Sequence, residues 1–259
     1  MQHSIIVQLI GDKLHLAPLD ENKLHNVLDL ATGTGIWAIE FAKKYPFAHI
    51  TGTDLSPVSH QGAPKNCKFI MEDAEDDWSF TEPFSYIHVR VVFSCFEDPL
   101  SIFRKAYDAL EPGGILELQD WEMPMGFANE PQPDSSTSAF VRWGGVTIEA
   151  AIKRGRPLNN VQHYARWLRE IGFEDVEEKK FVLPIGPWNN EDPLQEKLGT
   201  WQLLNMINAM EGFTLRNLSA IGWTPEQCQA LVNECKDEME SRKLKPWNYI
   251  VVVWGRKPL

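Results

Sequence analysis

The sequence NVLDLATGTGIWAIEFAKK, residues 26–44, constrains the fold more than any other part of the chain. A short apolar run leads into a loop that contains Gly33 and Gly35, and a segment with helical apolar spacing follows. This order predicts a buried strand, a tight turn and a helix. The glycines let the backbone pass close to a ligand, and the N-terminus of the helix offers free amides to an anion. A purely structural turn is the alternative, because a glycine pair alone is a weak signal.

Strand-like and helix-like segments alternate from residue 26 to residue 122. Strands are predicted at 26–31, 49–55, 67–73, 84–93 and 115–120, and helices at 35–45 and 98–114. Gly113 and Gly114 are expected to end the second helix. Strands connected through helices form crossover units, which give a mainly parallel sheet with helices on both faces. The predicted fold class is therefore α/β and Rossmann-like.

The pattern changes after Asp120. A polar, proline-containing loop is predicted at 122–138, helices at 139–155 and 161–173, a sixth strand at 174–185, a mainly helical region at 190–246 and a seventh strand at 248–257. Thr224 and Gln227 have the spacing of a capping box. We expect one domain over residues 1–259, with a cofactor-binding half at about 26–122, substrate-side helices and strand six at about 123–246, and the last strand at 247–257.

Composition narrows the classes of function. The net charge of −11 over 259 residues argues against general nucleic-acid binding, which needs a clustered basic face. The four cysteines form neither a CxxC pair nor a Cys/His cluster, so we expect no metal site, no disulfide framework and a reducing, cytoplasmic location. We also expect no membrane association, because no apolar run reaches the roughly 20 residues of a membrane span and no signal peptide is evident.

Three further positions indicate the class of cofactor. Asp29 precedes the glycine loop, where a carboxylate would repel a pyrophosphate but attract a cationic amino group. Asp54 ends the second strand, 19 residues after Gly35, where it can accept hydrogen bonds from both ribose hydroxyls. Asp73 and Ala74 follow the third strand, in position to meet an adenine amine. An adenosine that carries an amino acid is S-adenosylmethionine, which we predict as the cofactor.

The order of Asp29, the glycine loop, Asp54, Asp73-Ala74 and the segment ALEPGGILEL is similar to that of class I S-adenosylmethionine-dependent methyltransferases. Longer segments, among them LDLATGTGIWAIEFAKKYP, RWLREIGFEDVEEKKFVLPIGPW and YIVVVWGRKP, resemble the LaeA-like methyltransferases of filamentous fungi over essentially the whole chain. The resemblance implies a seven-stranded sheet with an antiparallel last strand, helical cap insertions and a role in secondary metabolism.

Some positions depart from the pattern of this family. Ala31 stands where the first glycine of the loop is usual, and Ser85 replaces an aspartate at the start of strand four. The segment VRVVFSCFEDP after that strand is unusual, which implies an acceptor pocket specific to this protein. A lid over the cofactor would have to begin at Gln2 and His3.

Methyl transfer requires a positioned acceptor and, for a hydroxyl acceptor, a group that removes its proton. The candidate catalytic residues are His88 at the end of strand four, Glu122 after strand five and His163 on a cap helix. A structural role is the alternative for each of them. The residues predicted to contact the cofactor are Asp29, Ala31, Thr32, Gly33, Gly35, Asp54, Leu55, Asp73, Ala74 and His88.

The aromatic residues of the C-terminal half favour an apolar small molecule as the acceptor. We predict a small-molecule methyltransferase that acts on a hydroxyl or carboxyl group, with N-methylation left open. Two alternatives come from other classes of protein. One is a regulatory LaeA-like protein in a gene-control complex, with a nuclear location and a protein partner. The other is a catalyst that binds S-adenosylmethionine but performs a cyclisation or rearrangement. Association as a homodimer also stays open.

Overall fold

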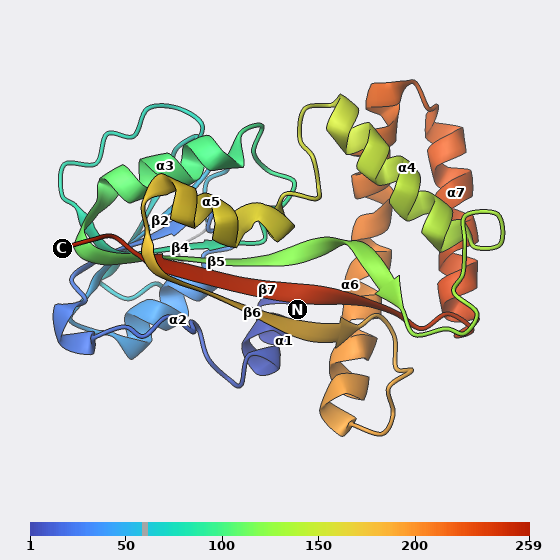
Figure 1. The fold of residues 1–259 in the computed structure, drawn as a ribbon, viewed down its shortest axis with the longest axis horizontal. Coiled ribbons are helices and arrows are strands. Elements are labelled where there is room, and N and C mark those ends of the chain that lie inside the picture. The colour runs from blue at the N-terminus through green and yellow to red at the C-terminus, as the bar shows by residue number, and fades with distance from the viewer. Residues whose placement is uncertain (59–61) are drawn as a thin grey trace.

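The computed structural model describes residues 1–58 and 62–259 and contains a seven-stranded sheet in the order β3-β2-β1-β4-β5-β7-β6 (Figure 1). The strands are β1 (Asn26–Leu30), β2 (His49–Asp54), β3 (Cys67–Met71), β4 (Phe84–Arg90), β5 (Leu110–Phe127), β6 (Glu174–Pro184) and β7 (Pro246–Arg256). Strands β1 to β5 are parallel, and β7 runs antiparallel to both β5 and β6. The predicted Rossmann-like fold with an antiparallel last strand is confirmed.

Helices cover both faces of the sheet. They are α1 (Gln2–Leu9), α2 (Ile36–Lys44), α3 (Pro99–Ala109), α4 (Ala139–Lys153), α5 (Tyr164–Ile171), α6 (Pro193–Leu218) and α7 (Pro225–Glu240), with short 3-10 turns at Glu21–Lys23, Val161–His163 and Ser219–Ile221. Helices α1 and α2 lie on one face, and α3 and α5 lie on the other (Figure 1). Because side chains alternate along a strand, neighbouring residues of β1 join different cores. Val27 packs with Trp37 of α2, whereas Leu28 packs with Phe103 of α3.

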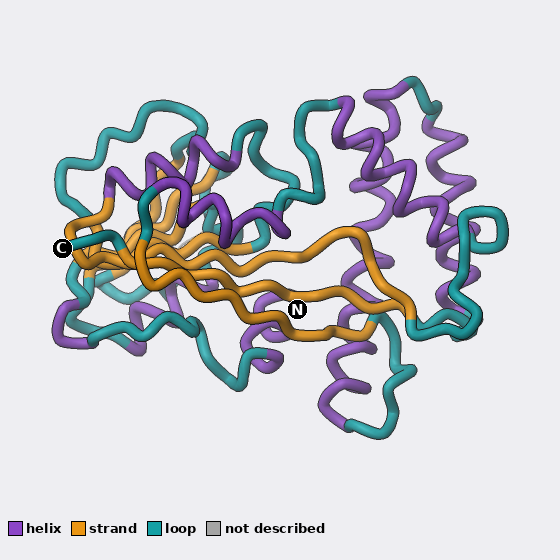
Figure 2. Tube along the Cα trace, in the orientation of Figure 1, coloured by secondary structure: helices purple, strands orange, loops and turns teal. Residues whose placement is uncertain are grey.

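Helices α4, α6 and α7 form a separate bundle beside the far ends of β5, β6 and β7 (Figures 1 and 2). Their apolar side chains make a third core, which includes Phe140, Trp143, Met210 and Leu231. The predicted capping box at the start of α7 is confirmed, with Thr224 accepting the Gln227 N–H and the Gln227 side chain accepting the Thr224 N–H.

Several predicted boundaries are wrong. The strand predicted at 84–93 ends at Arg90, where the backbone turns. Helix α3 ends at Ala109 rather than at the glycine pair, because Leu110 is already extended and pairs with the first residue of β4. Strand β5 continues to Phe127, through the first part of the segment predicted as a loop. The reason is tertiary: Phe127 pairs with Pro246 of β7, and a bulge between Glu122 and Gly126 absorbs the irregular sequence.

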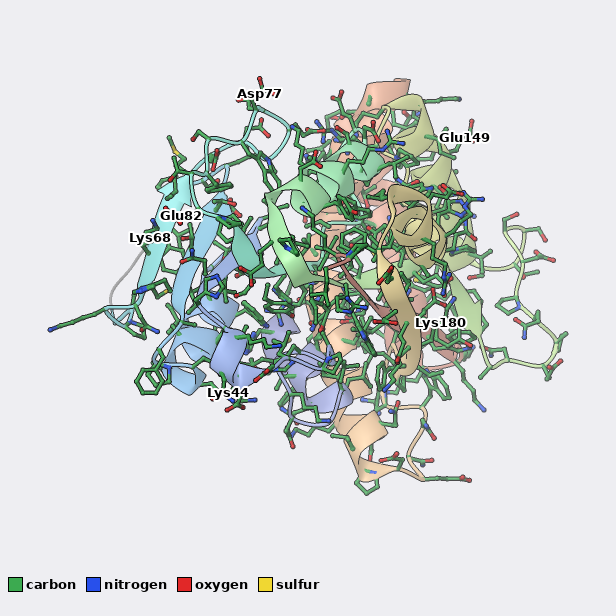
Figure 3. The ribbon with its side chains drawn as sticks, turned by 60° about the vertical axis from the view of Figure 1, so that its left-hand side comes forward. Lys44, Lys68, Asp77, Glu82, Glu149 and Lys180 are labelled. Carbon is green, nitrogen blue, oxygen red and sulfur yellow. The ribbon has the colours of Figure 1, made fainter. Side chains whose placement is uncertain are left out.

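Charged side chains of both signs lie around the outside of the molecule, on elements distant from one another in sequence. Figure 3 labels Lys44 on α2, Lys68 on β3, Asp77 and Glu82 before β4, Glu149 on α4 and Lys180 on β6, all of which are exposed. Among the helices of residues 1–58 and 62–259, none is long and apolar enough to span a bilayer.

Candidate active site

The loop between β1 and α2 has an unusual backbone. Ala31, Gly33 and Gly35 have φ angles of 54°, 60° and 74°, a left-handed conformation that only glycine adopts without strain. A Cβ on Gly35 would lie 2.6 Å from the Phe69 ring, so this position needs glycine. Around Gly33, by contrast, no atom of the described residues lies within 4 Å of a Cβ position. The loop is therefore tight at its end and open where a ligand can approach.

Asp54 ends β2 beside this loop. Its Oδ2 accepts the Gly33 N–H at 2.8 Å, and its Oδ1 accepts the Ser56 N–H at 3.0 Å. Leu55, the next residue, is 67% exposed. The Asp54 carboxylate has further lone pairs that can accept hydrogen bonds from the hydroxyls of a nucleoside. The exposed apolar side chain of Leu55 can contact the flat base.

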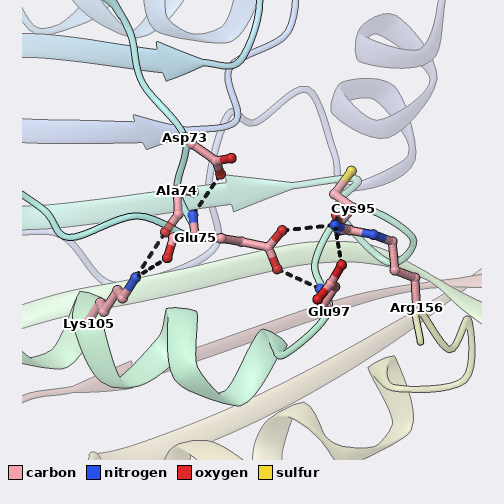
Figure 4. A network of polar contacts seen from close by, with 7 residues as sticks. All are labelled: Asp73, Ala74, Glu75, Cys95, Glu97, Lys105 and Arg156. Carbon is pink, nitrogen blue, oxygen red and sulfur yellow. Dashed lines mark hydrogen bonds and ion pairs between the residues drawn. The ribbon is translucent and has the colours of Figure 1, made fainter. Parts of the chain in front are cut away.

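The segment after β3 is held in place by a polar network (Figure 4). Asp73 accepts the Glu75 N–H at 2.8 Å, and Lys105 of α3 donates to the carbonyl oxygens of Ala74 and Glu75. The Glu75 carboxylate accepts the Glu97 N–H at 2.7 Å and pairs with Arg156 at 3.1 Å. These contacts connect the predicted adenine-binding segment to the loop after β4 and to the chain that follows α4.

Asp29 and His88 lie next to each other on neighbouring strands and are almost fully buried. Nδ1 of His88 lies 2.7 Å from Oδ1 of Asp29, while Oδ2 of Asp29 accepts the Thr32 hydroxyl hydrogen. The imidazole stacks on Trp37, with ring centroids 3.7 Å apart. Burial lowers the pKa of His88, and the hydrogen bond and charge of Asp29 act in the opposite direction. This cluster ties the glycine loop to the core.

Helix α1 begins at Gln2 and packs on the same face of the sheet as α2. His3 bridges two elements, with Nδ1 accepting from Arg90 of β4 at 2.9 Å and Nε2 lying 3.0 Å from the Glu40 carboxylate of α2. A helix does begin at the two residues where a lid would have to start.

A cavity of about 230 Å³ lies beyond the end of β4 and beside the last part of β5, where α4 and α6 approach the sheet. Its apolar wall is formed mainly by Phe93, Trp121, Met123, Met125, Trp143, Met206, Met210 and Phe213. Polar atoms come from Gln2, Ser94, Gln202, Asn205 and Asn248. The described lining residues include no Asp, Glu, His, Lys or Arg. The cavity thus suits a neutral, largely apolar molecule.

The turn that forms one side of this cavity is strained. Val91 has a φ of 58°, which is rare for a β-branched residue. Its N–H donates to Gln119, and the next N–H, of Val92, donates to the Asp120 carboxylate at 3.0 Å. Tyr164 of α5 donates to the same carboxylate oxygen. Strained backbone that neighbouring residues enforce is typical of ligand sites.

The family described as "Methyltransferase domain" matches residues 1–178. The chain belongs to this methyltransferase family.

Methyltransferase pytC of Aspergillus terreus is 33% identical over 260 residues, which cover 100% of this chain and 79% of that protein. The secondary metabolism regulator laeA of Aspergillus fumigatus is 30% identical over 260 residues, covering 98% and 67%. Phosphoethanolamine N-methyltransferase 2 of Haemonchus contortus, solved with S-adenosyl-L-methionine, has a TM-score of 0.54 and 19% identity, covering 99% and 52%. The predicted LaeA-like resemblance is confirmed, and the likeness to the solved structure supports the fold.

S-adenosylmethionine is the cofactor of this family, and the strand ends of the methyltransferase fit it. The unfilled space around Gly33 leaves room for a ligand at the glycine loop, and Asp54 and Asp73 supply acidic acceptors for hydroxyl and amine hydrogens. These positions lie at or just after the ends of three neighbouring strands of one sheet, β1, β2 and β3.

The three candidate catalytic residues do not line the cavity of the methyltransferase. His88 is fully buried beneath the glycine loop. Glu122, the candidate after strand five, does not face the cavity. Trp121 and Met123 line the cavity, so Glu122 lies on the other side of the strand, paired with Lys180 of β6 at 2.8 Å. His163 is half-buried against Trp167, on the α3–α5 face of the sheet.

The cavity residues on α6 were not predicted from the sequence. Gln202, Asn205, Met206, Ala209, Met210 and Phe213 all line the cavity and recur at intervals of three and four residues. This spacing marks one face of a helix, and its mixture of amides with methionines differs from an ordinary core face. The signal was therefore present in the segment WQLLNMINAM and the residues that follow it.

We expect Ala31→Gly to raise the free energy of unfolding by up to about 1 kcal/mol. Relief of left-handed strain is worth about 1–2 kcal/mol, and the added freedom of the unfolded chain removes part of this gain. Urea unfolding measures the change. Ala38→Gly, inside α2, is the matched control and should be destabilising by about 1 kcal/mol. A less stable Ala31→Gly protein would contradict the prediction.

Asp120 predicts a pH dependence of stability. Burial raises the pKa of Asp120 to about 7, although the hydrogen bonds from Trp121, Val92 and Tyr164 act to lower it. Between about pH 4 and pH 7 the folded protein thus keeps a proton that the unfolded chain has lost. The stability contributed by this carboxyl is full below that window and is lost as the pH rises through about 7.

The variant Asp120→Asn removes this titration. The free energy of unfolding of the natural protein, minus that of the variant, is therefore expected to fall by about 2–3 kcal/mol from about pH 5 to about pH 8. Urea unfolding of both proteins at the two pH values measures the difference. A difference that stays constant or grows with pH would contradict the assignment.

Proposed function

We propose that this methyltransferase transfers a methyl group from S-adenosylmethionine to a neutral, largely apolar small molecule, most simply by O-methylation. This molecule is held in the cavity beyond the end of β4 and beside the last part of β5. The observation that carries the proposal is the place of the cavity. Its turn, Val91 to Ser94, follows β4 directly, and β4 pairs with β1, whose end forms the glycine loop. Cofactor loop and cavity therefore share one edge of the sheet, where parallel α/β proteins bind ligands.

The residues proposed to hold the cofactor are those of the strand ends. Asp54 would accept hydrogen bonds from the ribose hydroxyls, Leu55 would contact the base, and Asp73 with Ala74 would meet its amine. The loop of Ala31, Thr32, Gly33 and Gly35 would pass beneath the amino-acid part. Asp29 and His88 have their polar contacts inside the protein, so we assign them the task of positioning Thr32 and the loop.

Bound S-adenosylmethionine supplies an already activated methyl group. The remaining task of the chain is to orient the acceptor and exclude water, which the apolar wall of the cavity can do. Because no titratable side chain lines the cavity within the described residues, we propose that the acceptor proton leaves to solvent. An acidic hydroxyl, such as a phenol or an enol, suits this arrangement, because little help from a base is needed.

The proposal is tested by calorimetric titration with S-adenosylmethionine and S-adenosylhomocysteine, followed by mass spectrometry of a fungal metabolite extract incubated with protein and cofactor. We expect both ligands to bind and a product heavier by one methyl group to form. The Asp54→Ala variant is the control and should form less of it. Binding without any methylated product would favour a regulatory role, as in the laeA relative, or a non-methylating reaction.

A further inference from the structure

Two buried amide side chains line the cavity and have unsatisfied oxygens. Gln202 of α6 is 3% exposed and Asn248 of β7 is 2% exposed. Oε1 of Gln202 and Oδ1 of Asn248 are buried and have no hydrogen-bond partner among the described residues. A buried acceptor without a partner is costly, and native proteins rarely keep one without a reason. Here the two residues that carry such oxygens line the same cavity.

The orientation of the Asn248 amide follows from the contacts of its nitrogen, Nδ2. Its Nδ2 donates to the Glu122 carbonyl oxygen at 3.5 Å and lies 3.9 Å from the Met123 sulfur, both on β5. Among the described residues, these are the two acceptors that the nitrogen contacts. The amide nitrogen is therefore used by the neighbouring strand, and the oxygen is left for a donor that the cavity receives.

The rest of the cavity wall limits what that donor can be. Trp121, Trp143 and the methionines around them offer no charge with which to pair an ion. An ionised ligand would lose its hydration without compensation, whereas a hydroxyl or N–H on an uncharged ring system would pair with an amide oxygen. Methionine side chains adapt readily to the shape of such a ring.

We propose that Gln202 and Asn248 are specificity-determining residues that accept hydrogen bonds from a hydroxyl or N–H group of a neutral, ring-containing acceptor molecule. This inference rests on the proposed function of the cavity. It adds that the acceptor carries at least one hydrogen-bond donor where it meets these amides. An analogue without the donor leaves a buried amide unpaired and is rejected for that reason.

The test measures binding and needs no turnover. Three probes of similar size are titrated by NMR into the protein saturated with S-adenosylhomocysteine: 2-naphthol, which has a neutral donor, 2-fluoronaphthalene, which has none, and 2-naphthoate, which is charged. We expect 2-naphthol to bind roughly 5- to 100-fold more tightly than either of the others. Equal affinity of the three probes, or no binding of any at its solubility limit, would overturn the proposal.

Variants then assign the preference to the two amides. Gln202→Met and Asn248→Leu should each reduce the preference for 2-naphthol without lowering the melting temperature, because each removes an unsatisfied buried oxygen. Asn217→Leu is the control, since Asn217 is a buried amide on α6 that does not line the cavity. The preference of this variant for 2-naphthol should equal that of the natural protein. A preference that survives both cavity variants, or is lost in the control, would overturn the assignment.

A lower melting temperature of both cavity variants would also overturn it, because the amides would then serve the fold. Binding of S-adenosylhomocysteine is followed in every variant and shows that the cofactor side is intact. Failure of the proposed methyl transfer has a different signature, namely bound cofactor without methylated product from any extract. The two failures are therefore distinguishable.

Discussion

Asp54→Ala is expected to weaken binding of S-adenosylmethionine by about 1–3 kcal/mol, roughly 5- to 150-fold. The carboxylate would lose charge-assisted hydrogen bonds to the ribose, and the Gly33 N–H would lose the acceptor that now lies 2.8 Å away. Calorimetric titration measures the change directly. Both effects also apply to S-adenosylhomocysteine, so we expect its affinity to fall together with that of S-adenosylmethionine.

Two variants separate these contributions. Asp54→Asn keeps one oxygen acceptor but removes the charge, so its affinity should lie between those of the natural protein and Asp54→Ala. Asp237→Ala, on the exposed surface of α7, removes an aspartate remote from the loop and should leave the affinity unchanged. Cofactor affinity within twofold of the natural protein in Asp54→Ala would show that the pocket lies elsewhere.

Trp37→Ala is expected to lower the free energy of unfolding by about 3–5 kcal/mol. Trp37 is 1% exposed, stacks on both His88 and Phe41, and donates from Nε1 to the Leu14 carbonyl oxygen at 2.8 Å. Its loss leaves a large void beneath the glycine loop, and the Leu14 carbonyl oxygen keeps only the hydrogen bond from Gln119, at 3.1 Å. Such a cost is a large share of the stability of an ordinary domain.

Urea unfolding followed by far-ultraviolet circular dichroism measures this effect without relying on tryptophan fluorescence. Trp37→Phe is the graded control: it retains the aromatic ring but not the donor, so it should cost less than the alanine variant. If Trp37→Ala unfolds within 1 kcal/mol of the natural protein, the ring has little structural importance and His88 is held mainly by its other contacts, among them Asp29.

Most of the sheet could be predicted from the sequence because its strands are short apolar runs separated by clear helix and turn signals. The strand ends with Asp29, Asp54 and Asp73 could also be placed, since parallel strands bring their carboxyl ends to one edge. Local pattern was sufficient for these features. It also located the capping box at Thr224 correctly.

The remainder depended on contacts between distant residues. The end of α3 and the extension of β5 were set by pairing with β4 and β7, which local propensity does not report. The burial of His88 under Trp37 and the pairing of Glu122 with Lys180 likewise arise only when the chain is folded. The role of a titratable residue near a strand end, catalytic or structural, thus cannot be assigned until the face of the sheet to which it points is known.

The separate core of α4, α6 and α7 has a consequence for how such proteins diversify. Met206, Met210 and Phe213 form part of the cavity wall, yet they pack with this helical bundle and make no part of the glycine loop. Substitutions there can be accepted by selection one at a time, since they leave the residues of the glycine loop unchanged. Gene duplication followed by drift in this bundle is therefore a short route from one acceptor to another.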